Sequence, residues 1–351
     1  MIAGVFSVVH HADDVRIREK LIPTLANDFT VEYHTRTPSP SQIDGFTWHA
    51  FRGSRLMRNV SLLLRLMSRR FDVAVLVDPE TFLAGILASR RTNVVFDIHE
   101  NVPAQIGTKN VPFKKALSRL AVLILKAAEK AGTIVLAEPG YAELFSREHP
   151  VFENFPRWEA MPPMAPGDGS VIYVGDITEQ RGALHLAEAV AGTDKHLVMI
   201  GRCSPELASR IESVVGNGSA TVELTGRLPW RAAMARLASA AVAVSPLTDT
   251  PNYRHSLPTK VLEYLGLGVP VVATNLPGTT DVLTGRPGVT LVAPGDVPAL
   301  RQAIHSASRA EVRQAAQDSA AGVRADFEWP TERVRGFYTA LVGEPGFRPD
   351  R

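Results

Sequence analysis

Short apolar runs alternate with amphipathic segments along most of the chain. Apolar runs of about four to eight residues, separated by segments whose apolar positions recur every three or four residues, predict parallel strands connected by helices. The strands predicted in the first half are 2–9, 29–34, 46–51, 72–77, 93–98 and 133–137. The helices predicted between them are 14–27, 54–70, 79–90, 112–131 and 139–148.

The pattern is interrupted once and then starts again. Residues 157–169, RWEAMPPMAPGDG, are rich in proline and lack periodicity, which is typical of a linker. The strands predicted after this segment are 170–175, 196–201, 221–226, 241–246, 269–274 and 289–294. The helices predicted there are 181–191, 204–215, 230–239, 258–267, 296–328 and a last one at 330–341.

These elements predict an α/β protein with two Rossmann-like domains, each a doubly wound parallel sheet, facing each other across a cleft. The predicted divisions are a first domain at 1–155, a linker at 156–169, a second domain at 170–329 and a C-terminal helix at 330–351 that packs back on the first domain. Ligands of such sheets bind at the carboxyl ends of strands. Three strands of the second half end in Gly175, Gly201 and Gly226, where a ligand can approach the backbone closely.

Composition narrows the class of protein. The 351 residues suit two domains, and 45% hydrophobic with 21% charged residues is ordinary for a globular chain. The first residues lack the basic start of a signal peptide, no apolar run reaches about 18 residues, and the single cysteine, Cys203, excludes an internal disulfide. We therefore expect a cytoplasmic protein, and the missing export signal disfavours a bilobal solute receptor.

The net charge is only +2, but two segments of the chain are strongly basic. Residues 53–70 contain five arginines and no acid, and residues 107–130 contain six basic residues and one glutamate. Both segments are amphipathic. They predict either packed helices with a solvated face or helices that rest on anionic lipid at the inner face of a membrane. No nucleic acid partner is expected.

Several catalytic signatures are absent from the sequence. No strand is followed by a G-x-G-x-x-G motif, and there is no Walker loop, no G-x-S-x-G motif and no pair of His or Asp residues with metal-ligand spacing. We therefore expect no metal ion and no dinucleotide cofactor.

The segment SLPTKVLEYLGLGVPVVAT predicts a short helix before a buried strand. Pro258 suits the first helical position, and Gly266 and Gly268 suit the end. The predicted helix opens on Pro258, Thr259 and Lys260. Its free N–H groups form a positive pole with Lys260 that would attract an anion such as phosphate.

The chain resembles the nucleotide-sugar glycosyltransferases of the GT-B fold, family 4. The resemblance covers about residues 1–340 and rests on the order and spacing of SLPTKVLEYLGLGVPVVAT, IYVGDITEQRG, VELTGRLPWRAAMARLASAAVAVSPL and HHADDVRIREKLIPTLAND. It implies a retaining, metal-independent transfer from a nucleotide-diphosphate sugar, which is a substrate and not a cofactor. The second domain would hold this donor, and the first would hold a sugar, lipid-linked or natural-product acceptor.

The resemblance assigns the donor's ribose to Glu263, which matches the second glutamate of the family's E-x7-E motif. The alternative is a helix-surface glutamate paired with Lys260. The first glutamate, which contacts the donor sugar, falls on His255. That departure indicates either a different sugar or an ordinary loop histidine.

The donor's diphosphate is assigned to Arg181, the second residue of the family's basic pair. The first residue of that pair is replaced by Asp176, and we expect Lys260 to supply the lost cation. The turn Gly226-Arg227-Leu228 matches the family's base-binding turn. For the side chain of Arg227 a simple strand-ending turn explains the sequence nearly as well.

In the first half, FDIHEN matches the family's strand that ends in a histidine near the donor sugar, here His99. We count His99, Arg181, His255 and Lys260 as candidate catalytic residues. Asp13, Asp14 and Arg16 match the loop and helix near the acceptor, although Asp13 or Asp14 could equally cap the helix.

Other functions remain open. An inverting transferase or a nucleotide-sugar epimerase could use the same fold. Because Asp176 and His255 depart from the pattern, the chain could also be a non-catalytic partner subunit that binds nucleotide or another transferase.

Overall fold

The computed structural model describes residues 1–40, 44–103, 106, 112–216, 218–251, 253–254 and 258–343. It divides into two compact units. Unit 1 comprises 1–154 with 329–351, and unit 2 comprises 155–328. No helix within the described ranges is both long enough and apolar enough to cross a membrane.

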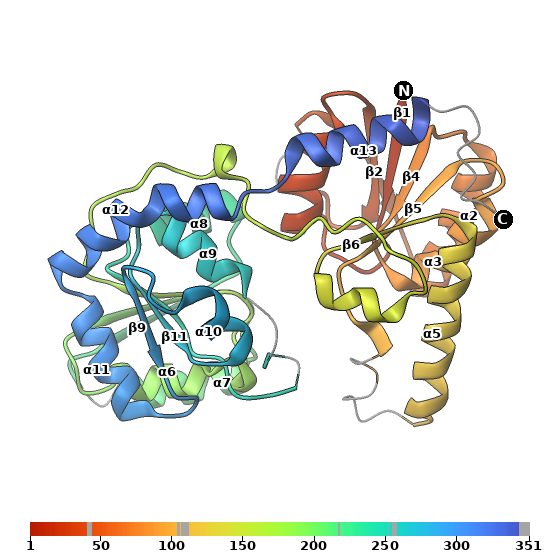
Figure 1. The fold of residues 1–351 in the computed structure, drawn as a ribbon. Helices are drawn as coiled ribbons and strands as arrows, with labels where there is room; N and C mark the ends of the chain where they lie inside the picture. The colour runs from red at the N-terminus through yellow and green to blue at the C-terminus, as the bar shows by residue number, and fades with distance from the viewer. Residues whose placement is uncertain are drawn as a thin grey trace. The chain divides into compact units, whose positions relative to one another are not determined.

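The described part of unit 1 contains a six-stranded sheet with the order β3-β2-β1-β4-β5-β6, and all of its strand pairs are parallel (Figure 1). Its strands are β1 (Ile2–Phe6), β2 (Thr30–Arg36), β3 (Phe46–Phe51), β4 (Val73–Leu76), β5 (Asn93–Ile98) and β6 (Thr133–Leu136). The order reverses between β1 and β4, which is the arrangement of a doubly wound sheet.

Side chains of each strand in unit 1 alternate between two cores. On one face, Val5 and Val75 pack with the π-helix Arg16–Leu21, α1 (Ile22–Leu25) and α13 (Thr331–Gly343). On the other face, Phe6 and Leu76 pack with α2 (Arg55–Ser68), α3 (Phe82–Ala88) and α5 (Lys114–Ala131).

The last helix belongs to unit 1 although it follows unit 2 in the sequence. Trp329 donates from Nε1 to the Thr24 hydroxyl at 2.9 Å, and Arg335 forms an ion pair with Asp28 at 2.9 Å. The side chain of Asn93 donates to the carbonyl of Leu341 at 3.1 Å. These contacts hold α13 against unit 1.

Unit 2 repeats the same topology. Its described residues form a six-stranded parallel sheet with the order β12-β11-β10-β7-β8-β9, which reverses between β7 and β10. Its strands are β7 (Val171–Val174), β8 (His196–Ile200), β9 (Thr221–Gly226), β10 (Val242–Ser245), β11 (Val271–Thr274) and β12 (Val289–Val292). The predicted fold class and strands are therefore confirmed in both units.

Helices cover both faces of the second sheet. They are α6 (Ala183–Val190), α7 (Pro205–Val215), α8 (Trp230–Ser239), α9 (Thr259–Gly266), α10 (Pro277–Leu283), α11 (Val297–Ala307) and α12 (Ala310–Asp326). One core joins the sheet to α6, α7 and α11, and the other joins it to α8, α9 and α12.

Residues 157–169, expected as a linker, include a 3-10 turn at Trp158–Ala160. Trp158 donates to the carbonyls of Arg324 and Phe327 within unit 2.

Three helix predictions need correction. The helix predicted at 296–328 is two helices, because Arg309 is extended and the Ser308 hydroxyl bonds to the carbonyl of Ile304. The helix predicted at 14–27 begins as a π-helix. The short helix α10 was not predicted at all.

The third correction concerns 139–148, where only a 3-10 segment at Pro139–Leu144 forms. The chain beyond it bonds to Glu129 instead of continuing a helix. Ser146 and Arg147 donate their backbone N–H groups to Oε1 of Glu129 at 2.9 and 3.0 Å, and the His149 ring lies 3.0 Å from the same oxygen.

Glu129 should stabilise the protein in a pH-dependent way. Burial alone would raise the pKa of Glu129, but hydrogen bonds from His149 and the following loop outweigh it and lower the pKa to about 2. A lowered folded-state pKa gives stability that is present above the unfolded value, near 4.5, and is lost as the pH falls through about 2. We expect Glu129→Gln to lower the free energy of unfolding at pH 7 by about 1–3 kcal/mol.

Urea unfolding at a series of pH values measures this difference. The gap between wild type and Glu129→Gln should narrow as the pH falls from about 4.5 towards 2. Glu143→Gln, at an exposed position near the same loop, is the control and should leave stability unchanged. A gap that stays constant across this range would contradict the prediction.

Candidate functional site

The carboxyl ends of β7 and β10 flank the point where the strand order of unit 2 reverses, which is where ligands of such sheets bind. The backbone is packed tightly there. Gly182, at the start of α6, has a φ of +75°, and a Cβ on it would lie 1.8 Å from the carbonyl oxygen of Pro246. Only glycine fits this position, and it brings the turn containing Arg181 against the end of β10.

Lys260 and Arg181 converge on Tyr173, a residue of β7. The Lys260 ammonium lies 4.0 Å from the centroid of the Tyr173 ring. Arg181 donates from Nε to the Tyr253 hydroxyl at 3.4 Å. The Tyr173 hydroxyl in turn donates to the carbonyl of Asp176 at 2.9 Å, which fixes the turn after β7.

The ammonium of Lys260 is shielded from solvent and has no hydrogen-bond partner among the described residues. Burial lowers the pKa of Lys260 well below its usual value, the neighbouring Arg181 lowers it further, and Glu263 opposes the shift. A buried, unpaired ammonium beside a guanidinium is costly for the folded protein. The negative charge of an anion bound here would offset that cost.

Helix α9 holds Lys260 in place. Tyr264, four residues later, accepts a hydrogen bond from the backbone N–H of Val174 at 3.1 Å, so α9 is tied to the end of β7. The helix begins at Thr259, and Pro258 is its extended N-cap and not its first residue. Glu263 is 8% exposed, so it is not the helix-surface glutamate considered as an alternative.

The three strand-ending glycines differ in their surroundings. A Cβ on Gly201 would lie 1.9 Å from the carbonyl oxygen of Gly175, so packing between neighbouring strands requires this glycine. A Cβ on Gly175 would lie 3.3 Å from Nη1 of Arg181. Gly226 has open space around it among the described residues. After it, Arg227 is exposed and Leu228 packs partly against the core.

Asp176 does not stand alone at the position where the resemblance expects a cation. Arg202, which follows Gly201 at the end of β8, donates from Nε and Nη2 to the two carboxylate oxygens of Asp176 at 3.1 and 2.8 Å. This bond and the positive charge of Arg202 lower the pKa of Asp176. His255, the candidate sugar-contacting residue, lies outside the described residues.

Unit 1 has a second cluster where its own strand order reverses, between β1 and β4. Asp78, which follows β4, is fully buried. Its Oδ2 accepts hydrogen bonds from the Ser7 hydroxyl at 2.9 Å and from the backbone N–H groups of Val9, at 2.8 Å, and Val8. Its Oδ1 contacts Nδ1 of His10. Asp78 thereby fixes both the loop after β1 and the ring of His10.

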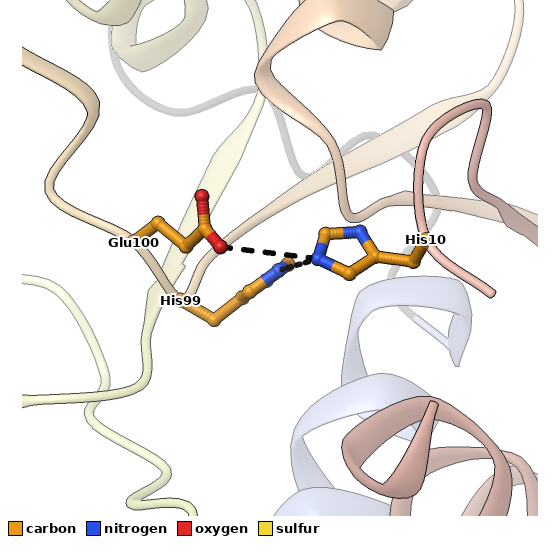
Figure 2. Close-up of side chains that lie close together, drawn as sticks. All are labelled: His10, His99 and Glu100. Carbon is orange, nitrogen blue, oxygen red and sulfur yellow. Dashed lines mark hydrogen bonds and ion pairs between the residues drawn. The ribbon is translucent and has the colours of Figure 1, made fainter. Parts of the chain in front are cut away.

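His10, His99 and Glu100 point toward one another (Figure 2). Nε2 of His10 lies 3.3 Å from Nε2 of His99 and 4.0 Å from a carboxylate oxygen of Glu100. Burial would lower the pKa of His10, but the hydrogen bond to Asp78 and the nearby carboxylates outweigh it and raise the pKa to about 9. His99 and Glu100 follow β5, so the predicted position of His99 at a strand end is correct.

The three residues predicted to lie near the acceptor, Asp13, Asp14 and Arg16, contact other residues of unit 1. Arg16 is buried, donating to Asp97 at 2.8 and 3.0 Å and to the carbonyl of Phe152 at 3.1 Å. Asp14 accepts from the backbone N–H of Ile17 at 3.2 Å, which is helix capping. Asp13 lies 3.6 Å from Arg18. The side chain of Arg16 is therefore occupied within the core of unit 1.

Sequence reasoning missed His10, Asp78, Glu100, Arg202 and both tyrosines beside Arg181. The available signal was position: Asp78 and Glu100 are polar residues directly after apolar strands. The sequence contained no spacing that would pair His10 with residues about 70 and 90 positions away.

Comparisons with known proteins agree with this architecture. Residues 168–309 match the family model of glycosyl transferases group 1. No curated protein matches the chain in sequence.

Solved structures share the fold over nearly the whole chain. Sucrose-phosphate synthase from Thermosynechococcus elongatus is similar with a TM-score of 0.72 and 15% identity, covering 97% of this chain and 98% of that one. HepE from Anabaena, in complex with UDP-glucose, has a TM-score of 0.71 and 12% identity over 97% and 99%. WaaG, a glycosyltransferase involved in lipopolysaccharide biosynthesis, has a TM-score of 0.68 and 13% identity over 98% and 100%. The family match and the shared GT-B fold support an enzyme that transfers a glycosyl group.

The unpaired ammonium of Lys260 predicts opposite effects on stability and on anion binding. We expect Lys260→Met to raise the free energy of unfolding by about 1–3 kcal/mol, because an apolar side chain of similar length replaces a buried charge. The same change should weaken binding of a nucleoside diphosphate by about tenfold or more. Arg181→Ala should weaken binding similarly without the gain in stability.

Urea unfolding and isothermal titration with UDP, GDP and ADP measure the two effects. Arg210→Ala is the control, since Arg210 is an exposed arginine paired with Glu179 and should leave binding unchanged. If Lys260→Met binds the preferred nucleotide as tightly as wild type does, the anion site lies elsewhere.

Proposed function

We propose that this protein is a retaining, metal-independent glycosyltransferase that uses a nucleotide-diphosphate sugar as donor. The observation that carries the proposal is the buried, unpartnered ammonium of Lys260 beside Arg181 at the strand-order reversal of unit 2. The match of this unit to glycosyl transferases group 1 agrees with it. HepE, which shares the fold, has been solved with UDP-glucose bound.

The chemistry follows from where charge develops. As the bond between the sugar and the diphosphate breaks, negative charge builds up on the leaving oxygen. That charge would be neutralised by the guanidinium of Arg181, the ammonium of Lys260 and the free N–H groups of α9. A divalent ion has this role in other transferases. The acceptor oxygen bonds to the anomeric carbon, and its proton passes to the departing diphosphate.

The remaining donor contacts are assigned from the resemblance. Glu263 would accept hydrogen bonds from the ribose hydroxyls, and its burial on α9 suits a fixed acceptor. The turn at Gly226-Arg227-Leu228 would read the base, and the open space around Gly226 leaves room for it. His99 and His255 would contact the donor sugar.

Direct assay of the donor tests the reaction. With UDP-glucose as a first probe and water as acceptor, the product seen first by NMR should be α-glucose, because retention preserves the anomeric configuration. Hydrolysis should proceed at the same rate with and without added magnesium or manganese. UDP-galactose, UDP-N-acetylglucosamine and GDP-mannose extend the panel.

Each rival function gives another result in this assay. An inverting transferase releases β-glucose first, and an epimerase changes the nucleotide sugar without releasing sugar. Tight nucleotide binding without turnover of any donor would indicate a non-catalytic partner subunit. A strict requirement for magnesium or manganese would contradict neutralisation by the protein's own cations.

A specific observation also favours contact with a membrane. Large apolar side chains on unit 1, each 38–84% exposed, line one side of three helices: Leu56, Met57, Val60, Leu64 and Met67 of α2, Leu83 and Leu87 of α3, and Phe113, Leu117, Leu120 and Leu123 at α5. Helix α3 contacts both α2 and α5. We call this set the apolar face. The same helices α2 and α5 also contain arginines and lysines.

The sequence leaves two alternatives for the basic helices: packed helices with a solvated face, or helices that rest on anionic lipid. The apolar face argues against the first. The stripe at Leu56, Val60 and Leu64 points to solvent, whereas Leu62 and Leu66 fill the core. A packed helix needs only the inward stripe. Exposed apolar residues among cations suit an anionic bilayer surface, which agrees with a lipid-linked acceptor.

Lipid binding should depend on both the apolar side chains and the basic side chains of this surface. We expect the double variant Leu56→Ser, Leu64→Ser to bind vesicles containing phosphatidylglycerol at least about tenfold more weakly than wild type, since burial of each leucine is favourable by about 1.5–3 kcal/mol. Binding of wild type should weaken with salt and with neutral vesicles. Vesicle sedimentation measures these quantities, and Met164→Ser, at an exposed position in unit 2, is the control. Absence of binding at low salt would contradict the membrane contact and indicate a water-soluble acceptor.

A further inference from the structure

We propose that His10, His99 and Glu100 form a zinc site at the carboxyl edge of the sheet in unit 1. The ligand atoms of the three side chains lie within 4.8 Å of one another. Figure 2 shows the carboxylate of Glu100 and the ring of His99 both directed at the same nitrogen of His10.

The spacing of the two histidines fits zinc. Their Nε2 atoms are 3.3 Å apart. Two nitrogen ligands of a tetrahedral zinc ion, each about 2.0–2.1 Å from the metal, are separated by about 3.3–3.4 Å. Both rings can therefore bind one ion with almost no change in their separation.

Glu100 supplies the third ligand. One of its carboxylate oxygens is 4.0 Å from Nε2 of His10, and the side chain is 40% exposed, so rotation of an unrestrained carboxylate closes the remaining distance. Two imidazoles and one carboxylate are a common ligand set for zinc, with a fourth position open to water or another oxygen.

Asp78 prepares His10 for this role. Its Oδ1 contacts Nδ1 of His10, so Nδ1 keeps its proton. Zinc would displace the proton of Nε2, the nitrogen that lies toward His99 and Glu100. The carboxylate is itself fixed by the loop after β1. A carboxylate behind a ligating histidine is the usual support of a metal site, because it orients the ring and increases its basicity.

The charge around the site favours a cation. Asp78, Glu100 and the more distant Asp14 all contribute negative charge at His10. Among the described residues, neither Asp78 nor Glu100 forms an ion pair with an arginine or lysine. A divalent ion would balance this charge.

A second cluster in unit 1, Glu32 with His34 and His49, has the same residue types but a different charge environment. Arg69 forms an ion pair with Glu32, so a cation is already present there. This cluster gives a control for binding of zinc by other histidines of the chain.

The zinc site is independent of the donor chemistry in unit 2, so each can fail without the other. Its open position would accept a hydroxyl oxygen.

Metal binding to the full chain tests the site without any enzymatic assay. After chelator treatment and dialysis, titration with zinc chloride should give one tight site per chain, and cobalt should give the visible spectrum of tetrahedral coordination. His10→Ala, His99→Ala and Glu100→Gln should each weaken zinc binding by about 10–100-fold or more. His49→Ala should bind zinc as wild type does.

Thermal unfolding without metal identifies any variant that fails to fold. The conservative change Glu100→Gln keeps the size of the side chain and serves where an alanine variant is unstable. Zinc binding that is unaffected by all three changes, or wild type without a stoichiometric site, would overturn the proposal. The two imidazoles would then share a proton.

Discussion

Parallel strand pairing is the constraint on which both candidate sites depend. When all strands of a sheet run in one direction, their carboxyl ends meet at one edge, and helices must cover both faces. The strand order then reverses at one place, where successive connections leave toward opposite faces. In this chain that reversal lies between β1 and β4 in unit 1 and between β7 and β10 in unit 2. The candidate residues of each unit lie near its reversal, on or after neighbouring strands and on α9.

The two reversals carry opposite electrostatics. In unit 2, Lys260 and Arg181 place positive charge beside Tyr173, and Lys260 finds no hydrogen-bond partner among the described residues. In unit 1, Asp78 and Glu100 surround His10 with negative charge. One topology thus carries positive charge at the reversal of one unit and negative charge at that of the other, and the difference arises from the residues that each unit places there.

Buried charges among the described residues differ in whether they have a hydrogen-bond partner. The guanidinium of Arg16 donates to both carboxylate oxygens of Asp97 and to the carbonyl of Phe152, and it holds the π-helix against β5. Removal of one partner from such a pair is strongly destabilising, so it belongs to the framework. Lys260 is the contrasting case, because its burial without a partner costs stability that ligand binding would restore.

The sequence by itself determined the fold class, because the alternation of apolar runs and amphipathic segments reflects burial of each sheet on both faces. It also placed Lys260, Arg181 and His99 at element ends through local signals. Tertiary structure decided which of these residues meet. The close approach of Gly182 to Pro246 and the hydrogen bond from the N–H of Val174 to the Tyr264 hydroxyl bring Arg181 and Lys260 together across about 80 residues of sequence. Likewise, His10 meets Asp78 and His99 only because β1, β4 and β5 are neighbours in the sheet. Periodicity reports the environment of each residue, whereas the pairing of distant residues depends on strand order, which no local pattern contains.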